Sequence, residues 1–332
     1  MQSEDIEETV MPLESIRSLV KTDLSATDHF ICNELQSDIP FINQMVEYII
    51  QCGGKRIRPL LVLLTAKAFD HPHETHIRLA AAIELIHTAT LLHDDIVDNS
   101  NLRRGHVTAH TLWGNEASVL VGDFLYSRAF QLIVKLQNIS ILNIFADATN
   151  IIAEGEVLQL INCHNAAITE EVYYDVIGRK TAKLFEVATQ AGAALVTDNQ
   201  HHLTAMQQYG LHLGIAYQLI DDALDYSASA EQTGKNMGND LTEGKPALPL
   251  IYALQQSNKT QATLLREAIE KGENENILAL MEIVESTGAI KYTADAAKRH
   301  VAKANAFLKE IPDSPYRQAL DTLATFVVER SY

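Results

Sequence analysis

Residues 77–98 decide the fold and read IRLAAAIELIHTATLLHDDIVD. Alanine, leucine and isoleucine fill nearly every side of a helix built from this stretch, and a helix that is apolar all round is a buried one. Its last five residues, Asp94-Asp95-Ile96-Val97-Asp98, break the apolar pattern abruptly. The stretch therefore predicts a buried central helix that ends in acidic side chains.

The same DDxxD pattern returns at Asp221-Asp222-Ala223-Leu224-Asp225, again at the end of an apolar segment. The first and last aspartates of each motif lie about one helical turn apart on one face. Carboxylates so close repel each other and are costly to bury without a counter-charge. Magnesium prefers such oxygen ligands and fills its remaining positions with water and phosphate. A solvent-facing acidic helix end would explain one motif, whereas two motifs on buried helices predict a magnesium site.

Outward from these motifs, the chain reads as helix after helix. Helical spacing of apolar residues predicts further helices at 117–136, 139–160, 170–195, 203–226 and from 248 to the C-terminus. Residues 227–246 contain Ser, Gly, Asn and Pro and predict a loop, and residues 1–12 predict a frayed acidic tail. We find no strand alternation and no short-period repeat. The sequence therefore predicts an all-α fold with one domain at residues 13–332.

The composition narrows the class of protein. The chain is 47% hydrophobic and 21% charged, which is typical of a soluble globular protein. A net charge of −17 argues against a nucleic-acid partner. Three scattered cysteines, Cys32, Cys52 and Cys163, suggest neither a disulfide framework nor a zinc site. The acidic start is unlike a signal peptide, and the apolar runs are too short for a transmembrane segment. We expect a cytoplasmic protein.

Basic residues recur beside the acidic motifs. Gly53-Gly54-Lys55-Arg56-Ile57-Arg58-Pro59 precedes a helix, where glycines permit close approach and the basic side chains can hold a diphosphate. Arg103 and Arg104 follow the first motif, and Lys180, Lys235 and Lys245 are isolated cations. Each of these alone is more often a solvated cation or part of a salt bridge.

Taken in order, the motifs resemble those of the trans-polyprenyl diphosphate synthases. The matching stretches are GGKRIRP (53–59), DDIVD (94–98), LRRG (102–105), GRKT (178–181), QLIDDALDY (218–226), GK (234–235) and EGKP (243–246). The likeness covers nearly the whole chain. Residues 83–93, 118–124 and 153–160 look most like the bacterial octaprenyl diphosphate synthases that supply quinone side chains. One departure is Gly238-Asn239-Asp240, where the family usually has Gly-Asp-Asp.

This resemblance implies a fold and a reaction. The fold is the isoprenoid synthase fold, a bundle of long antiparallel helices around a deep central cavity, typically in a homodimer. The reaction is a Mg²⁺-dependent condensation of isopentenyl diphosphate with an allylic diphosphate, here farnesyl diphosphate. The implied product is a long-chain polyprenyl diphosphate, octaprenyl, which passes to a membrane prenyltransferase.

The resemblance also implies residue roles. Asp94 and Asp98 bind two Mg²⁺ and Asp221 a third, supported by Asp95, Asp222 and Asp225. The allylic diphosphate is held with the three ions by Arg103, Lys180 and Lys235, and Lys245 is a further binding residue of the loop. The diphosphate of isopentenyl diphosphate is held by Lys55, Arg58, His87 and Arg104. Thr181 and Gln218 present neutral oxygens near the carbocation. For His87 the alternative is a hydrogen-bonded core histidine.

The length of the prenyl product depends on the helix that carries Asp94. Ala89 and Thr90, about one turn before Asp94, are small and leave room for a growing tail. The tail would continue past Ile86 towards a floor that includes Ile133 and Phe145. Close helix packing is the alternative reason for the two small residues.

Competing functions differ in what they require. A class I terpene cyclase needs one diphosphate substrate and has no use for the 53–59 motif or a second DDxxD. A non-catalytic subunit of a heteromeric synthase would have lost aspartates or basic residues, and none is missing here. A shorter-chain synthase, making farnesyl or geranylgeranyl diphosphate, remains an alternative product assignment. A phosphohydrolase would need a base that activates water, and the sequence offers no candidate.

Overall fold

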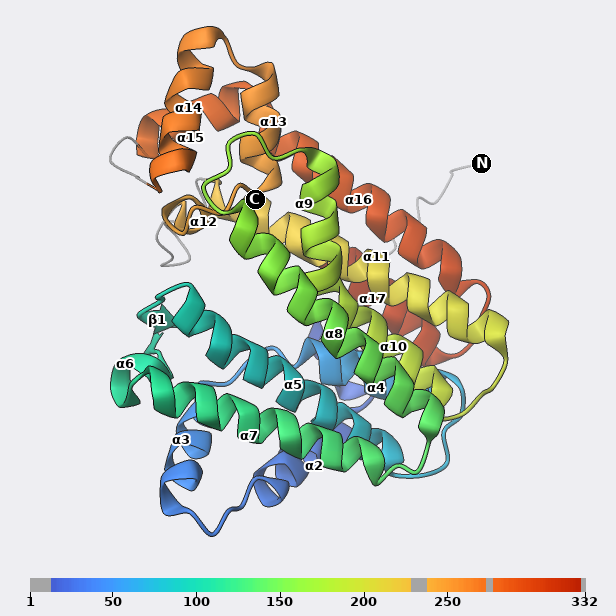
Figure 1. Cartoon of the computed structure of the whole chain (residues 1–332). Coiled ribbons are helices and arrows are strands. Elements are labelled where there is room, and N and C mark those ends of the chain that lie inside the picture. Colours follow the sequence, from blue (N-terminus) through green and yellow to red (C-terminus); the bar gives the residue numbers. More distant parts are fainter. Residues whose placement is uncertain (1–12, 228–237, 273–276, 330–332) are drawn as a thin grey trace, which may run out of the picture.

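The computed structural model describes residues 13–227, 238–272 and 277–329, which lie mostly in helices (Figure 1). The first half holds α1 (Leu13–Ser18), α2 (Lys21–Glu34), α3 (Pro40–Gln51), α4 (Ile57–Ala68), α5 (Thr75–Val97), α6 (Ala109–Trp113), α7 (Asn115–Val134) and α8 (Ile139–Asn162). The second half holds α9 (Glu170–Ile177), α10 (Lys183–Ala194), α11 (Gln200–Asp225), α12 (Asn239–Thr242), α13 (Leu248–Gln256), α14 (Lys259–Lys271), α15 (Ile277–Ser286), α16 (Ala289–Leu308) and α17 (Pro315–Glu329). The predicted all-α fold is confirmed. The predicted tail at 1–12 lies outside the described residues.

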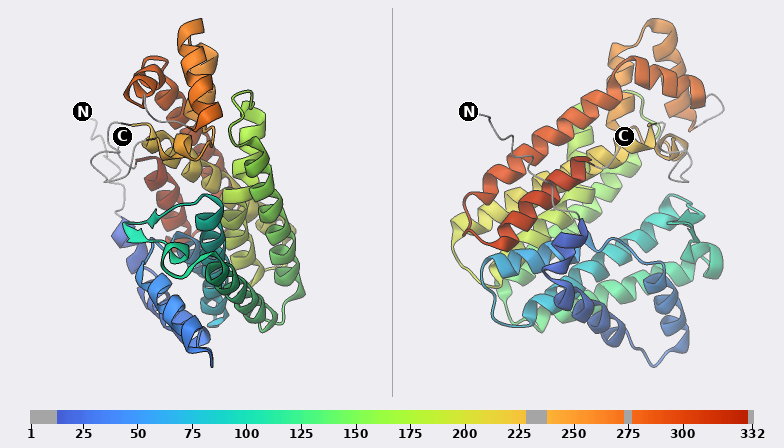
Figure 2. Two further views of the ribbon diagram at one scale, coloured as in Figure 1. Left: turned by 60° about the vertical axis from the view of Figure 1, so that its left-hand side comes forward. Right: turned by 180° about the vertical axis from the view of Figure 1, so that it is seen from behind.

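Long helices lie side by side and form the bundle (Figures 1 and 2). Helix α11 packs along α10 and along α16, and α5 packs along α7. Helix α4 contacts α5, α10 and α17, so it joins the two groups. This arrangement brings the carboxyl ends of α5 and α11, which carry the two DDxxD motifs, to the same region of the molecule.

Local sequence signals set several helix starts. Asn138, Thr169 and Asn199 each accept a hydrogen bond from a backbone N–H in the first turn of the helix that follows. Such caps satisfy donors that have no partner within the helix. Pro40 begins α3, where its missing N–H costs nothing.

Three predicted segments differ from the structure. The predicted loop at 227–246 contains the short helix α12, and residues 228–237 of that loop lie outside the described residues. Residues 170–195 are not one uniform helix, because the π-helical turn η1 (Gly178–Ala182) separates α9 from α10. The described chain also contains two strands, β1 (Leu102–Arg103) and β2 (His106–Val107), which form a small antiparallel hairpin. Arg104 and Gly105 both have positive φ at its tip, as two-residue hairpin turns require. Strands of two residues each are too short to show an alternation of apolar and polar residues in the sequence.

The described apolar residues form two clusters. The larger fills the bundle, and the smaller joins α13, α14 and α15 through residues such as Leu250, Leu265 and Val284. The assignment of residues 13–332 to one domain stays a prediction. Helix α7 is long and apolar enough, by length and composition alone, to cross a membrane, although it packs along α5.

Candidate active site

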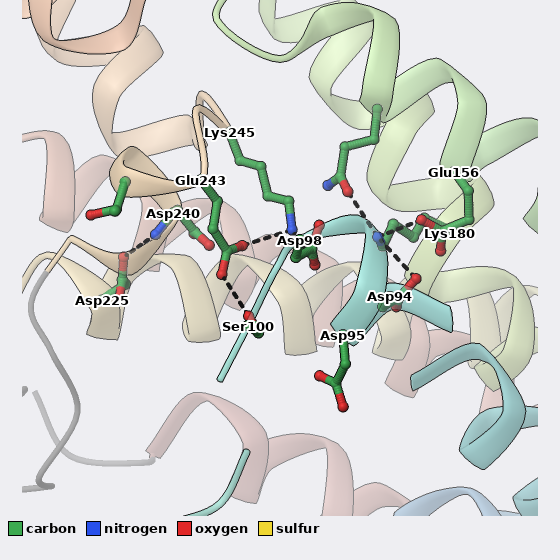
Figure 3. A network of polar contacts seen from close by, with 12 residues as sticks. Asp94, Asp95, Asp98, Ser100, Glu156, Lys180, Asp225, Asp240, Glu243 and Lys245 are labelled. Carbon is green, nitrogen blue, oxygen red and sulfur yellow. Dashed lines mark hydrogen bonds and ion pairs between the residues drawn. The ribbon is translucent and has the colours of Figure 1, made fainter. Parts of the chain in front are cut away.

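The first aspartate motif lies between two lysines that come from distant parts of the chain (Figure 3). Lys180 Nζ in η1 lies 3.7 Å from Asp94 Oδ1, and Lys245 Nζ lies 2.7 Å from Asp98 Oδ2. The side chain of Asp95 points away from those of Asp94 and Asp98, and it accepts a hydrogen bond from Arg103 Nε at 2.6 Å. The two aspartates on one helix face are therefore those that meet the lysines.

Lys180 is held from a second side by α8. Its ammonium group lies 2.5 Å from Glu156 Oε2 and donates to Gln159 Oε1 at 2.8 Å. Burial and the negative charge of Asp94 raise the pKa of Glu156 to about 7, although Lys180 opposes the shift. Burial also raises the pKa of Asp94; Lys180 opposes this shift, and the charge of Asp98 adds to it. The carboxylates around Lys180 outnumber the positive charges that compensate them.

Lys245 comes from the loop after α12. Its ammonium group contacts Glu243 at 2.7 Å as well as Asp98, and Glu243 in turn accepts from Ser100 Oγ at 3.3 Å. Burial lowers the pKa of Lys245, but the charges of Asp98 and Glu243 outweigh it, so the net pKa is raised. Lys245 thus stays charged and links the loop to the end of α5.

The π turn places Lys180 and Thr181. A π turn inserts one extra residue in a helix and is frequent at functional sites. Two glycines let neighbouring helices approach it: a Cβ on Gly155 of α8 would lie 2.8 Å from Lys180 N, and one on Gly214 of α11 would lie 2.6 Å from Ala182 Cα. Helices α8 and α11 therefore pack directly against the backbone of η1.

The second aspartate motif has different surroundings. Asp222 is 3% exposed; its Oδ2 accepts from Tyr173 Oη at 2.5 Å and its Oδ1 accepts from Gln218 Nε2 at 2.7 Å. Burial raises the pKa of Asp222 to about 7, and the hydrogen bonds from Tyr173 and Gln218 oppose the shift. Gln218 Oε1 accepts from Thr181 Oγ1 at 3.0 Å. The buried Asp222 thus orients Gln218, and Gln218 in turn binds the hydroxyl of Thr181.

Asp221 and Asp225 are the outer residues of the motif and lie about one turn apart on α11. Asp225 Oδ2 accepts from the backbone N–H of Asp240 at 3.2 Å, and the carbonyl of Asp240 accepts from the N–H of Lys245 at 2.8 Å. Asp225 thereby fixes the loop that carries Lys245. Burial lowers the pKa of the Arg58 guanidinium, and the negative charges of Glu84 and Asp221 are among those that oppose the shift.

The donor set fits Mg²⁺. The aspartates of both motifs offer only oxygen ligands, and both stand at helix carboxyl ends, where the helix dipole favours cations. Within the described residues, no three His, Cys, Asp or Glu side chains lie close enough to hold one ion alone. Mg²⁺ usually takes one or two carboxylates and completes its shell with water and phosphate. Ions shared between these aspartates and a diphosphate match this arrangement.

A basic end forms around Arg58 and His87. Arg58 Nη1 donates to His87 Nε2 at 3.1 Å, and the guanidinium lies 4.5 Å from the ring centroid of Phe185. Burial, followed by the charge of Arg58, holds the pKa of His87 well below its usual value, so the imidazole is the acceptor. Arg58 Nε is buried and has no hydrogen-bond partner among the described groups. A buried orphan donor is expected where a ligand supplies the acceptor.

The neighbouring basic residues divide into two kinds. Arg56 pairs with the buried Glu84 at 2.6 Å and with Asp28 at 3.3 Å, so it anchors the 53–59 segment to the bundle. The side chains of Lys55 and Arg104 are exposed, and Arg104 Nη1 donates to the carbonyl of Gly53. The hairpin tip is thereby fastened to the Gly53-Gly54 turn. Lys235 lies outside the described residues.

The predicted chain-length residues lie in the bundle. Ala89, Ile86, Ile133 and Phe145 are fully buried in the larger cluster, and Thr90 is half-buried and donates to the carbonyl of His87 at 2.8 Å. That a tail passes them stays a prediction.

Several site residues were missed by sequence reasoning. Glu156, Gln159, Glu243 and Tyr173 all contact predicted site residues, yet none was assigned a role. Glu156 and Gln159 are three residues apart on one helix face, which is a usable signal. Glu243 begins the EGKP stretch that contains Lys245, which is also a usable signal, whereas Tyr173 carries no local signal.

Comparisons with known proteins identify the family of this chain. The family model described as "Polyprenyl synthetase" matches residues 39–286. The chain is 47% identical over 321 residues to octaprenyl diphosphate synthase of Escherichia coli (strain K12), covering 96% of this chain and 99% of that protein.

Solved structures agree as well. A polyprenyl synthase from Caulobacter crescentus, complexed with calcium and isoprenyl diphosphate, has a TM-score of 0.91 at 42% identity, covering 96% of this chain and 97% of that one. A decaprenyl diphosphate synthase from Rhodobacter capsulatus also has a TM-score of 0.91, at 40% identity over 96% and 99% of the two chains. The ordered motifs, the helical bundle and these matches together place the chain in the polyprenyl synthetase family.

Proposed function

We propose that the enzyme condenses isopentenyl diphosphate with farnesyl diphosphate and repeats the addition to octaprenyl diphosphate, for a quinone side chain. The observation that carries this proposal is the division of the site. Acidic motifs with Lys180 and Lys245 form one end, and Arg58 with His87 forms a metal-free basic end. The diphosphate that leaves and the diphosphate that stays on its substrate need binding sites of different charge, and the two ends meet this need.

The acidic end suits the diphosphate that leaves. Breaking the allylic carbon–oxygen bond puts growing negative charge on the diphosphate, and charges fixed beforehand lower that barrier. Mg²⁺, as three ions in the substrate complex, would supply most of this charge at Asp94, Asp98 and Asp221. Lys180 and Arg103 would contact the same group, because Glu156 and Asp95 hold them at the edge of the site. Lys235 and Lys245 are assigned to this diphosphate as well.

The basic end suits the diphosphate that stays. Isopentenyl diphosphate must not ionise, so cations without metal bind it: Lys55, Arg58 and Arg104, with His87 between them. Its double bond attacks the allylic cation, and Thr181 and Gln218 present neutral oxygens there. The proton that is then lost passes to the released diphosphate, so no side-chain base is needed.

The length of the product depends on α5. Eight extended isoprene units of roughly 5 Å each span on the order of 40 Å, about 27 helical residues at ~1.5 Å. A tail running past Thr90, Ala89 and Ile86 towards Ile133 and Phe145 would use this length. The relatives named for octaprenyl and decaprenyl synthesis support a long product over a farnesyl or geranylgeranyl one.

A homodimer explains the apolar outer surface of α7 and α8. Leu120 on α7 is 67% exposed, and Ile161 on α8 is 69% exposed; Val119, Val157 and Leu160 are also exposed. Exposed apolar patches of this kind mark interfaces, and two-fold dimers pair the same patch. The same surface accounts for the hydropathy of α7 without a membrane span. We place the dimer in the cytoplasm, from which the product reaches a membrane prenyltransferase.

Product sizing tests the proposal. Purified protein with Mg²⁺, farnesyl diphosphate and labelled isopentenyl diphosphate should yield a product that chromatographs as the eight-unit alcohol after dephosphorylation. A cyclase would give a hydrocarbon without consuming isopentenyl diphosphate, and a hydrolase would release farnesol. No product from the protein alone, but product after adding a second subunit, would identify a non-catalytic partner.

A further inference from the structure

Four polar side chains form one continuous hydrogen-bonded chain from α9 to the π turn. It runs from Tyr173 through Asp222 and Gln218 to Thr181, with donor–acceptor distances of 2.5, 2.7 and 3.0 Å. Tyr173 is 4% exposed and Asp222 is 3% exposed, so water does not compete for the first link. The direction of each hydrogen bond can therefore be read from the groups themselves.

The carboxylate of Asp222 fixes the first two directions. In its ionised form Asp222 only accepts, so both the Tyr173 hydroxyl and the neighbouring group of Gln218 donate to it, and these two hydrogen bonds favour that ionised form. Gln218 can donate only through its amide nitrogen. Its NH₂ group therefore faces Asp222, and its carbonyl oxygen faces the opposite way.

The orientation of Gln218 fixes the hydroxyl of Thr181. The Gln218 oxygen that faces Thr181 can only accept, so the Thr181 hydroxyl donates its single hydrogen to it. The lone pairs of Thr181 Oγ1 are then free of that hydrogen. Thr181 adjoins Lys180, which reaches the first aspartate motif, and under the proposed function these lone pairs are available to the allylic cation.

We propose that Tyr173 is a positioning residue that, through Asp222 and Gln218, commits the Thr181 hydroxyl hydrogen away from the allylic cation. This inference rests on the proposed function, because it assigns a purpose to an oxygen beside that cation. A lone pair directed at a developing positive charge stabilises it, whereas an O–H hydrogen directed there would repel it. Tyr173 does not touch the substrates; it fixes the far end of the chain.

The position of Tyr173 suits this role. It lies on α9, which runs directly into the π turn, while Asp222 and Gln218 lie one turn apart on α11. The hydrogen bond from Tyr173 therefore ties α11 to the helix that carries Thr181. Without this hydroxyl, Gln218 is the one remaining side-chain donor to Asp222 among the described residues, and the carboxylate can rotate.

The first test is Tyr173→Phe, with kcat and both KM values measured by isopentenyl diphosphate incorporation. We expect kcat to fall about tenfold, as for one lost hydrogen bond that matters in the transition state, with both KM values within about twofold. Tyr174→Phe is the matched control, because it removes a hydroxyl from the adjacent residue, which is not part of the hydrogen-bonded chain. Equal kcat in Tyr173→Phe and wild type overturns the proposal.

A double-mutant cycle separates positioning from a general effect on the fold. In a Thr181→Val background, which has no hydroxyl to orient, Tyr173→Phe should lower kcat by less than about twofold. In a Thr181→Ser background, which keeps the hydroxyl, the full loss should return. The same tenfold loss in all three backgrounds would show that Tyr173 acts on structure alone.

A second variant keeps the proposal testable if Tyr173→Phe does not fold. Asp222→Asn keeps the shape of the side chain but lets it donate, so Gln218 can turn its oxygen inward and reverse the chain. We expect the same loss of kcat and the same dependence on the Thr181 hydroxyl. An unchanged kcat in folded Asp222→Asn overturns the inference, whereas failure of the wild type to make any prenyl product would refute the proposed function instead.

Discussion

The two DDxxD motifs share one sequence pattern but have different surroundings. Asp94 and Asp98 face the ammonium groups of Lys180 and Lys245, and the middle residue Asp95 pairs with Arg103. The middle residue is buried in both motifs, but in the second motif Asp222 accepts from the neutral groups of Tyr173 and Gln218 among the described residues. Spacing sets which residues share a face, but the helices that cross the motif set what each carboxylate does.

The largest effect expected separates the outer aspartates from the middle ones. Asp94→Ala should lower kcat by several orders of magnitude, because it removes a carboxylate assigned to Mg²⁺. Asp222→Asn should cost about tenfold and leave the Mg²⁺ concentration for half-maximal rate unchanged. Steady-state rates across a Mg²⁺ titration measure both.

The thermal stability of the variants provides a control for this comparison. The metal-free Asp94→Ala variant should melt no lower than the wild type, because charge repulsion in the acidic cluster is relieved. Near-normal turnover by Asp94→Ala would contradict the metal assignment. A large rise in the Mg²⁺ requirement of Asp222→Asn would make the two motifs alike after all.

The second effect separates the acidic end from the basic end. Lys180→Ala should weaken apparent affinity for the allylic substrate, and Arg58→Ala that for isopentenyl diphosphate. Losing a charge-assisted hydrogen bond costs roughly 1.5–3 kcal/mol, about ten- to a hundredfold in affinity. KM measured for each substrate in both variants gives the answer, and equal changes for both substrates would show that the site is divided wrongly.

The third effect concerns product length rather than rate, and it uses a second difference between the motifs. Four residues before Asp94 stands Thr90, whereas four residues before Asp221 stands Tyr217, which packs against Phe185. An aromatic ring near the first motif should close the path that we assign to the tail. Ala89→Tyr should therefore stay active and make mainly farnesyl or geranylgeranyl diphosphate, measured by chromatography. Unchanged long product would show that the tail follows another route.

The smallest effect is on stability against pH and probes Glu156. Its pKa is raised to about 7 from 4.5, so the folded protein binds more protons than the unfolded chain between these values. The stabilising contribution is present below pH 4.5 and is lost as the pH rises through about 7. In chelator, wild-type Tm should fall more across this window than that of Glu156→Gln, by on the order of a few degrees. Parallel curves would mean that Glu156 titrates normally.

The candidate site was predictable where chemistry follows from local spacing. The two aspartate motifs, the 53–59 segment and Lys180 were found from residue type and order, and Arg58 does donate a hydrogen bond to His87. Arg56 shows the limit, because nothing local distinguishes it from Lys55 or Arg58, yet it pairs with Glu84 and Asp28. The partner of a cation depends on which helix passes it.

The sequence by itself determined the helical class, the bounds of the central helix to within two residues, and the order of the motifs. These follow from apolar periodicity and residue type, which are local properties of the chain. Helix packing determined that Asp222 is buried and accepts from Tyr173, and that Glu156 and Gln159 hold Lys180. These contacts link α9 to α11 and α8 to η1 across more than twenty residues of chain, so no local pattern encodes them.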